Sequence, residues 1–220
     1  MSQSRSIFLT TLLLYCISIS YAQQDINAEP YLYAVSGQFL MNEGYLIHMD
    51  YKREDIMRET FAEGEGTIWM KGLKYKIEVD EYIVLFDGDK LYSQNTETKE
   101  VYISTPDPEQ PSFLQAVPIR IFKSYKKDFN YRLMGRIPFN GRECIEVQLY
   151  PKDLSGPYSM LSLFINPGNQ KLEGILLKHK EGIHYTIILK DVKGKQILDD
   201  SMFKFDPAKY PDTEIIELLD

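Results

Sequence analysis

The side chains of this sequence that could do chemistry are scattered rather than gathered into a motif. Ser124 and Lys127 fit a Ser-x-x-Lys pattern, but the Ser-Asp-Asn and Lys-Thr-Gly segments of that enzyme class are missing. Glu78 and Asp80 alternate with lysines along a predicted strand, which indicates a solvated face rather than a general acid and base. We therefore expect a protein that is not an enzyme.

The three histidines give an equally weak metal signal. His179 and His184 flank the predicted Glu181-Gly182 turn, so a cross-strand pair of ligands is geometrically possible, while His48 stands alone. No Cys-x-x-Cys or His-Glu-x-x-His segment accompanies them, although zinc sites normally carry such spacings. The sequence predicts no metal and no cofactor.

An N-terminal segment has the pattern of a secretory signal peptide. Arg5 precedes an apolar run from Ile7 to Ile19, which ends in Ser20-Tyr21-Ala22. A basic start, a short apolar stretch and small residues before the cleavage point are typical of such peptides, and the run is too short for a comfortable membrane anchor. We expect residues 1–22 to be removed after Ala22 and the remaining residues, 23–220, to form one exported, soluble domain.

Cysteine usage fits that interpretation. Cys16 lies inside the apolar run, and bulky Tyr15 precedes it where a lipoprotein signal would carry a small residue. Removal of the signal leaves Cys144 alone, so no intramolecular disulfide is expected and the fold must depend on its core.

Composition narrows the class of protein. The 220 residues carry a net charge of −7, and 13% are aromatic. The negative charge argues against a nucleic-acid binder, which needs a basic face, and against simple adhesion to anionic membranes. Abundant aromatic side chains favour β-structure, so we expect a mainly β protein with some α-helix, an α+β fold.

The periodicity of the chain predicts a curled antiparallel sheet with helical additions. A helix is expected over 28–41 and a helical insert over about 111–127, after three closely spaced prolines. Tight turns between the predicted strands favour an antiparallel meander, and a sheet this wide must curl. The predicted strands cover residues 45–52, 67–70, 74–80, 82–86, 90–92, 99–104, 129–136, 143–150, 160–165, 172–180, 185–192 and 202–205, followed by an extended tail.

The insert is the candidate lid of a cavity. Tyr82–Phe86 and Met160–Ile165 are apolar on both faces, which means either that helices cover one face or that an apolar cavity lies beneath the insert. A Phe122→Glu variant separates these readings, because it unfolds a plain core but leaves a movable lid folded and unable to bind. We expect the lid. Its apolar stripe is formed by Phe113, Leu114, Val117, Ile121 and Phe122.

Three segments in the first half of the chain resemble the LolA family, the periplasmic carriers of outer-membrane lipoproteins. They are Gly64–Lys71, Leu73–Ile77 and Phe86–Tyr92, which match a glycine-to-tryptophan strand, an aromatic-rich strand and an Asp-Gly hairpin that leads into Leu-Tyr. Met202–Pro211 is similar to the last strand and tail of the family. One departure is Lys71-Gly72-Leu73, where family members often carry an arginine before a proline that is thought to hold the lid.

The resemblance implies an unclosed antiparallel β-barrel with an N-terminal helix, a helical lid and an apolar cavity for acyl chains. It implies a monomeric periplasmic chaperone for acylated lipoproteins, which receives them from an inner-membrane ABC transporter and passes them to an outer-membrane acceptor. The alternative left open is a periplasmic sensor or carrier of another lipid on the same fold. The implied acyl-binding residues are Trp69, Tyr75, Ile77, Val79, Phe86, Phe113, Leu114, Val117, Ile121 and Phe122.

Overall fold

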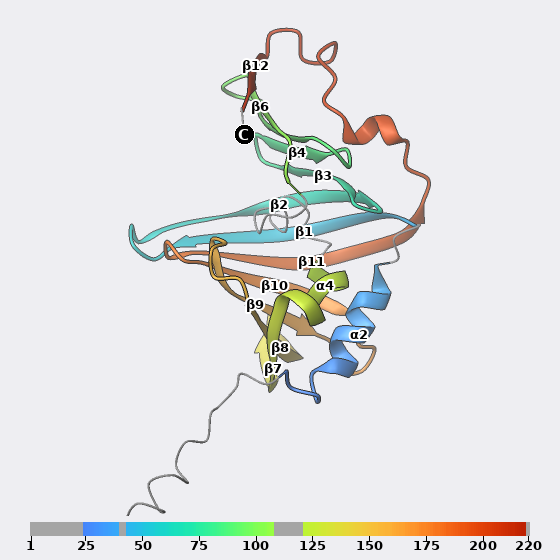
Figure 1. The fold of residues 1–220 in the computed structure, drawn as a ribbon, viewed down its shortest axis with the longest axis vertical. Coiled ribbons are helices and arrows are strands. Elements are labelled where there is room, and N and C mark those ends of the chain that lie inside the picture. Colours follow the sequence, from blue (N-terminus) through green and yellow to red (C-terminus); the bar gives the residue numbers. More distant parts are fainter. Residues whose placement is uncertain (1–23, 40–42, 108–120, 219–220) are drawn as a thin grey trace, which may run out of the picture.

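Twelve strands pair edge to edge into one sheet in the computed structural model, which describes residues 24–39, 43–107 and 121–218 (Figure 1). The strand order is β12-β6-β5-β4-β3-β2-β1-β11-β10-β9-β8-β7, with β12 and β7 at its two ends, so the barrel is unclosed. The strands are β1 (Gly44–Asp55), β2 (Thr60–Lys71), β3 (Lys74–Val79), β4 (Tyr82–Phe86), β5 (Leu91–Asn95), β6 (Glu100–Ser104), β7 (Phe129–Phe139), β8 (Arg142–Pro151), β9 (Tyr158–Ile165), β10 (Leu172–His179), β11 (Ile183–Gln196) and β12 (Glu214–Glu217).

Two antiparallel meanders make up this sheet, and their first and last strands join them. β1 to β6 form one meander, β7 to β11 form the other, and β1 pairs with β11. Local turn chemistry closes the hairpins: Asn140 and Gly141 both have positive φ, 47° and 74°, as the tight turn between β7 and β8 requires. In the turn after β4, the Asp87 carboxylate accepts hydrogen bonds from the backbone N–H groups of Asp89 and Lys90.

Strand alternation gives the sheet two faces. We define the helix-side face as the face that carries Tyr45 and Ile47 of β1, Tyr75 and Ile77 of β3, and Leu163 of β9, and the other as the opposite face. These side chains belong to one core together with residues of the helices α2 (Glu29–Gln38) and α4 (Ile121–Asp128). The core therefore lies between the helix-side face and the helices.

In the described part of the chain, two α-helices cover part of that face. α2 (Glu29–Gln38) has Pro30 in its first turn, and α4 (Ile121–Asp128) lies beside α2 (Figure 1). The Phe122 ring of α4 stacks on Phe39 at 5.5 Å between ring centroids. Lys126 Nζ pairs with Glu29 at 2.9 Å, which joins the exposed sides of the two helices.

A tail of residues 197–213 follows β11 and packs on the opposite face. It contains a 3₁₀ helix, η2 (Asp200–Phe203), whose first turn is capped by the Asp199 carboxylate accepting from the Ser201 N–H group. Phe203 is completely buried, and Phe205 stacks on Tyr92 of β5. The chain then ends in β12, which pairs with β6.

The predicted mainly β fold with an unclosed curled sheet is confirmed, and several details are corrected. The predicted strand over 202–205 is wrong, because Asp199 caps a 3₁₀ turn there and Phe203 is buried under the sheet. The sheet is not wholly antiparallel, since β12 pairs with β6 in parallel. β2 begins at Thr60 rather than at 67, because the charged and glycine-containing residues 60–66 pair with β1 despite their weak apolar pattern.

The helical predictions are met in part. The helix expected over 28–41 spans Glu29–Gln38, and the insert expected over about 111–127 contains α4 from Ile121 onward. The signal segment 1–22 and insert residues 108–120 lie outside the described residues. Among the helices that are described, none has the length and apolar character needed to cross a bilayer.

Candidate acyl-binding face

Rows of apolar side chains cross the helix-side face from strand to strand. One row that strand pairing defines joins directly opposed residues of five neighbouring strands. Because opposed residues place their side chains on the same face, they form one continuous apolar stripe. Its members are Val84, Ile77, Ile68, Ile47 and Val192. A second row beside it holds Phe86, Tyr75, Met70 and Tyr45.

Burial along these rows is uneven. Ile47, Tyr75 and Phe86 are buried, with 2%, 4% and 0% of their surfaces exposed. Five other apolar side chains of β2 to β5 on this face are only half-buried, although they pack against the same core. They are Ile68, Met70, Ile77, Val84 and Leu91. This half-buried apolar patch is the surface we name the open patch. It offers a ligand apolar contact area without requiring the core to unpack.

Beside the open patch, the side chains of two neighbouring strands occupy the space over a glycine of β2. Gly66 of β2 lies between Met49 of β1 and Val79 of β3 in the strand register. A Cβ at Gly66 would come within 2.7 Å of Val79 Cγ2 and 2.8 Å of Met49 Cε. The lack of a side chain there allows the neighbouring strands to place theirs over the gap.

The structure brings together most of the predicted site residues that it describes. Tyr75, Ile77, Val79 and Phe86 share the helix-side face, in successive rows of β3 and β4. Trp69 is separated from them, because it pairs with Lys76 on the opposite face, and Lys76 Nζ lies 5.2 Å from its ring centroid.

The lid residues divide in the same way. Phe122 is 9% exposed and Ile121 is half-buried, and both belong to or pack against the core. This packing favours the interpretation in which Phe122 completes a core. The other members of the stripe, Phe113, Leu114 and Val117, lie outside the described residues.

Sequence reasoning missed six residues of the rows. They lie in the same stripes as the predicted residues and are Tyr45, Ile47, Ile68, Met70, Val84 and Val192. The signal was present, since β1 shows clear period-two alternation and Met70 lies two positions after Ile68. What the sequence lacks is a marker for which face of a strand the helices cover.

Three ionisable groups of the sheet have raised pKa values. Burial raises the pKa of the Tyr75 phenol far above its usual range, so Tyr75 stays neutral. The hydrogen bond from the Tyr51 hydroxyl to Asp80 raises the pKa of Tyr51 to about 12. Burial also raises the pKa of the Cys144 thiol, which makes the reactive thiolate scarcer.

The histidines remain apart from one another in their contacts. His48 shares a hydrogen bond with Thr67 at 3.3 Å, and His179 accepts one from the Glu181 N–H group. Within residues 24–39, 43–107 and 121–218, no group of three or more His, Cys, Asp or Glu side chains is placed to hold a metal ion.

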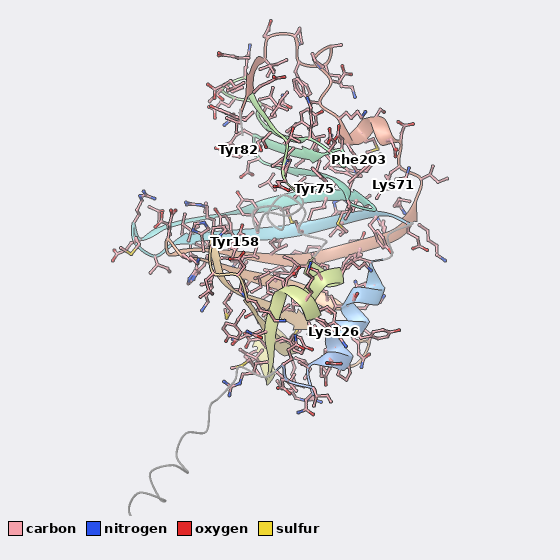
Figure 2. The ribbon with its side chains drawn as sticks, in the orientation of Figure 1. Lys71, Tyr75, Tyr82, Lys126, Tyr158 and Phe203 are labelled. Atoms are coloured by element: carbon pink, nitrogen blue, oxygen red, sulfur yellow. The ribbon has the colours of Figure 1, made fainter. Side chains whose placement is uncertain are left out.

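The segment that departs from the expected arginine and proline makes a different contact. Lys71 is the last residue of β2 (Figure 2). Its Nζ lies 3.0 Å from the Leu198 carbonyl oxygen and 2.8 Å from Asp200 Oδ1. Lys74 reaches the other oxygen of Asp200 at 2.7 Å. These lysines thus attach the C-terminal tail to the opposite face.

Comparison with known proteins identifies a matching family and similar structures. A family model described as "Outer membrane lipoprotein carrier protein LolA" matches residues 52–206. An uncharacterized conserved protein from Thermus thermophilus has a similar fold, with a TM-score of 0.54 and 10% identity over 87% of this chain and 99% of that one. A LolA superfamily protein from Nitrosomonas europaea aligns at a TM-score of 0.41 and 12% identity, over 81% of this chain and 97% of that one. No curated protein matches the chain.

Proposed function

We propose that this chain, which belongs to the LolA family of outer membrane lipoprotein carrier proteins, holds the acyl chains of lipoproteins on the helix-side face and carries them through the periplasm. The observation that carries the proposal is the open patch. It is an apolar surface that crosses four strands, β2 to β5, and its side chains are only half-buried although they pack against the core.

The energetics of the cargo explain why such a surface is needed. Each methylene taken from water is worth about 0.8 kcal/mol, so one long acyl chain contributes on the order of 10 kcal/mol. A free acylated protein would not cross an aqueous compartment at useful concentration. A half-open apolar face shields the chain and still lets it leave, which a closed pocket would hinder.

The family and the N-terminal signal pattern support the setting of this activity. A cleaved signal peptide over residues 1–22 would deliver the protein to the periplasm. There the proposed donor is an inner-membrane ABC transporter that releases lipoproteins, and the proposed acceptor lies in the outer membrane. The protein acts as a monomeric chaperone without metal or cofactor.

A charge placed on either face of one strand tests the proposal. Ile68 and Thr67 are neighbours on β2 and point to opposite faces, and both are half-buried. We expect Ile68→Glu to weaken binding of a fluorescent fatty-acid probe, and its displacement by a diacylated peptide, at least tenfold. Thr67→Glu adds the same charge and should change binding less than twofold.

Two further measurements separate the possible outcomes of this experiment. Circular dichroism shows whether both variants are folded. Equal binding by two folded variants would exclude the helix-side face as the acyl site. Native mass spectrometry of protein isolated from the periplasm then identifies the cargo: an acylated polypeptide supports the carrier, whereas free lipid supports a sensor or carrier of another lipid.

A further inference from the structure

Strand β11 lacks a neighbouring strand on one of its two sides along about half of its length. β1 follows β11 from Ile183 to Gln196, but β10 reaches only Ile188, which is paired with Gly174. In the described part of the chain, no strand pairs with β11 beyond that point on the β10 side. Residues 189–196 therefore form an open strand edge of about 26 Å, at about 3.3 Å per residue.

A helix side chain stops the neighbouring strand at this place. Gln38, the last residue of α2, accepts a hydrogen bond at 2.9 Å from the Leu172 N–H group at the start of β10. The tip of the β7–β8 hairpin forms the facing wall, where Phe139 stacks on Phe164. The edge and these walls border a groove of about 950 Å³ that is open to solvent, which we name the edge notch.

The lining of the edge notch suits the side chains of an extended peptide. Leu172, Leu189 and Val192 present apolar groups on the helix-side face, and Phe139 and Ile188 line the notch as well. A strand added to an open edge gains main-chain hydrogen bonds, while its alternating side chains enter pockets on the two faces. The notch supplies both kinds of contact.

Most charged groups of the edge notch already have partners. Arg142 pairs with Glu173 at 3.0 Å, and Glu43 accepts a hydrogen bond from the Tyr45 hydroxyl. Two further lining groups pair with residues outside the notch: Lys190 with Asp50 at 2.6 Å and Asp191 with Lys193 at 3.0 Å.

Two exposed lysines of the lining, Lys171 and Lys195, have no ion-pair partner among the described residues. Together with Arg142, Lys190, Glu43, Glu173 and Asp191, they give the notch lining a net charge of +1, within a chain whose net charge is −7. An acidic occupant would satisfy both charges.

We propose that the edge notch binds an extended acidic peptide, with alternating apolar side chains, as an added strand beside residues 189–196 of β11. The partner is thus a protein segment recognised by backbone pairing and by Lys171 and Lys195. The proposal is independent of acyl binding, because it uses the strand edge rather than the open patch.

The probe is a fluorescein-labelled peptide of eight residues in which valine alternates with glutamate, followed by fluorescence anisotropy. We expect saturable binding to the wild-type protein. A peptide with lysine in place of glutamate should bind at least tenfold more weakly, and a peptide N-methylated at alternate residues should not bind, because it cannot pair with the edge.

Matched variants locate the site. Lys171→Glu combined with Lys195→Glu should weaken peptide binding at least tenfold, whereas Lys204→Glu with Lys209→Glu reverses the same number of charges in the C-terminal tail and should change it less than twofold. The first pair should leave binding of the fatty-acid probe unchanged. This separates failure of the peptide site from failure of the proposed carrier function.

Hydrogen exchange gives a second readout. Backbone amides within residues 189–196 should gain protection when the peptide is bound. No saturable binding, equal weakening by both variant pairs, or protection confined to another strand would each overturn the proposal. Displacement of the peptide by the fatty acid, or dimerisation that fills the edge without it, would also overturn it.

Discussion

The two halves of the sheet bury different faces. On β8 and β9, the helix-side face packs into the core shared with α2 and α4, and Val147 and Leu163 are 0% and 1% exposed, whereas Ile175, Leu177 and Leu189 of β10 and β11 stay half-buried. In the β2–β6 half, the helix-side face carries the half-buried open patch, while the C-terminal tail covers the opposite face. The buried residues under the tail are Ile83, Leu85, Gln94, Val101 and Phe203.

This difference shows how a sheet can be stable and still offer an apolar surface. A strand needs apolar burial on at least one face, and the tail supplies it from behind in the β2–β6 half. The front of those strands then need not be filled by the protein's own side chains. Stability and binding are assigned to opposite faces of the same strands.

The largest expected effect on stability comes from shortening a buried side chain of β9. Leu163→Ala should lower the free energy of unfolding by about 3 kcal/mol, because it leaves a cavity in a packed core. Ile77→Ala removes a similar side chain from the open patch and should cost only about 1 kcal/mol, since Ile77 is half-buried. Urea denaturation followed by circular dichroism measures both. Equal losses would contradict the comparison between the halves.

Adding a methyl group at a glycine of each half should give a smaller contrast. A Cβ at Gly174 would lie 2.5 Å from the Phe139 ring and 2.6 Å from the Ile187 carbonyl oxygen, which is backbone and cannot easily move. Gly174→Ala should therefore cost about 2 kcal/mol. At Gly66 the two closest atoms are side-chain carbons of Val79 and Met49, and the Glu78 carbonyl oxygen is farther away at 3.0 Å, so Gly66→Ala should cost about 1 kcal/mol and weaken binding of the fatty-acid probe.

Thermal unfolding and probe titration of the two glycine variants test this contrast together. A Gly66→Ala variant that binds the probe as tightly as wild type would show that the filled gap is not part of the acyl site. A Gly174→Ala variant as stable as wild type would show that the hairpin tip of β7 and β8 is not fixed against β10.

A substitution under the tail should stabilise the protein. The amide of Gln94 is 2% exposed, and neither its nitrogen nor its oxygen has a hydrogen-bond partner among the described residues. Gln94→Leu removes this unsatisfied group and should raise the free energy of unfolding by about 1 kcal/mol. Gln148 is the control, because it donates to Glu146 and accepts from Tyr150, so Gln148→Leu should not stabilise.

Period-two alternation predicted both the existence of the β3 strand and the shared face of Tyr75, Ile77 and Val79. It could not say which face of β2 the helices cover, so Trp69 was grouped with residues that lie on the other side of the sheet. The position of the C-terminal tail could not be predicted from local sequence patterns either. The pairing of β12 with β6 joins residues more than one hundred positions apart, and no local pattern encodes such a contact.

The smallest expected effect concerns the attachment of the tail. The amines of Lys71 and Lys74, hydrogen-bonded to Asp200, lower the pKa of that carboxyl from 3.8 to about 2. A carboxyl whose pKa is depressed on folding adds stability above its unfolded pKa, and this contribution is lost as the pH falls toward its folded pKa. The attachment should therefore be complete above about pH 4 and weaken between pH 4 and pH 2.

Asp200→Asn tests that attachment without altering the shape of the side chain. The three groups are 55%, 42% and 30% exposed, so solvent screens their interaction and global stability should change little. Hydrogen exchange of the η2 amides is the sensitive measurement. Wild-type protection should fall between pH 4 and pH 2 after correction for the intrinsic exchange rate, and the variant should lack this step. A step of equal size in the variant would assign it to another carboxyl and would leave burial of Phe203 as what holds the tail against the sheet.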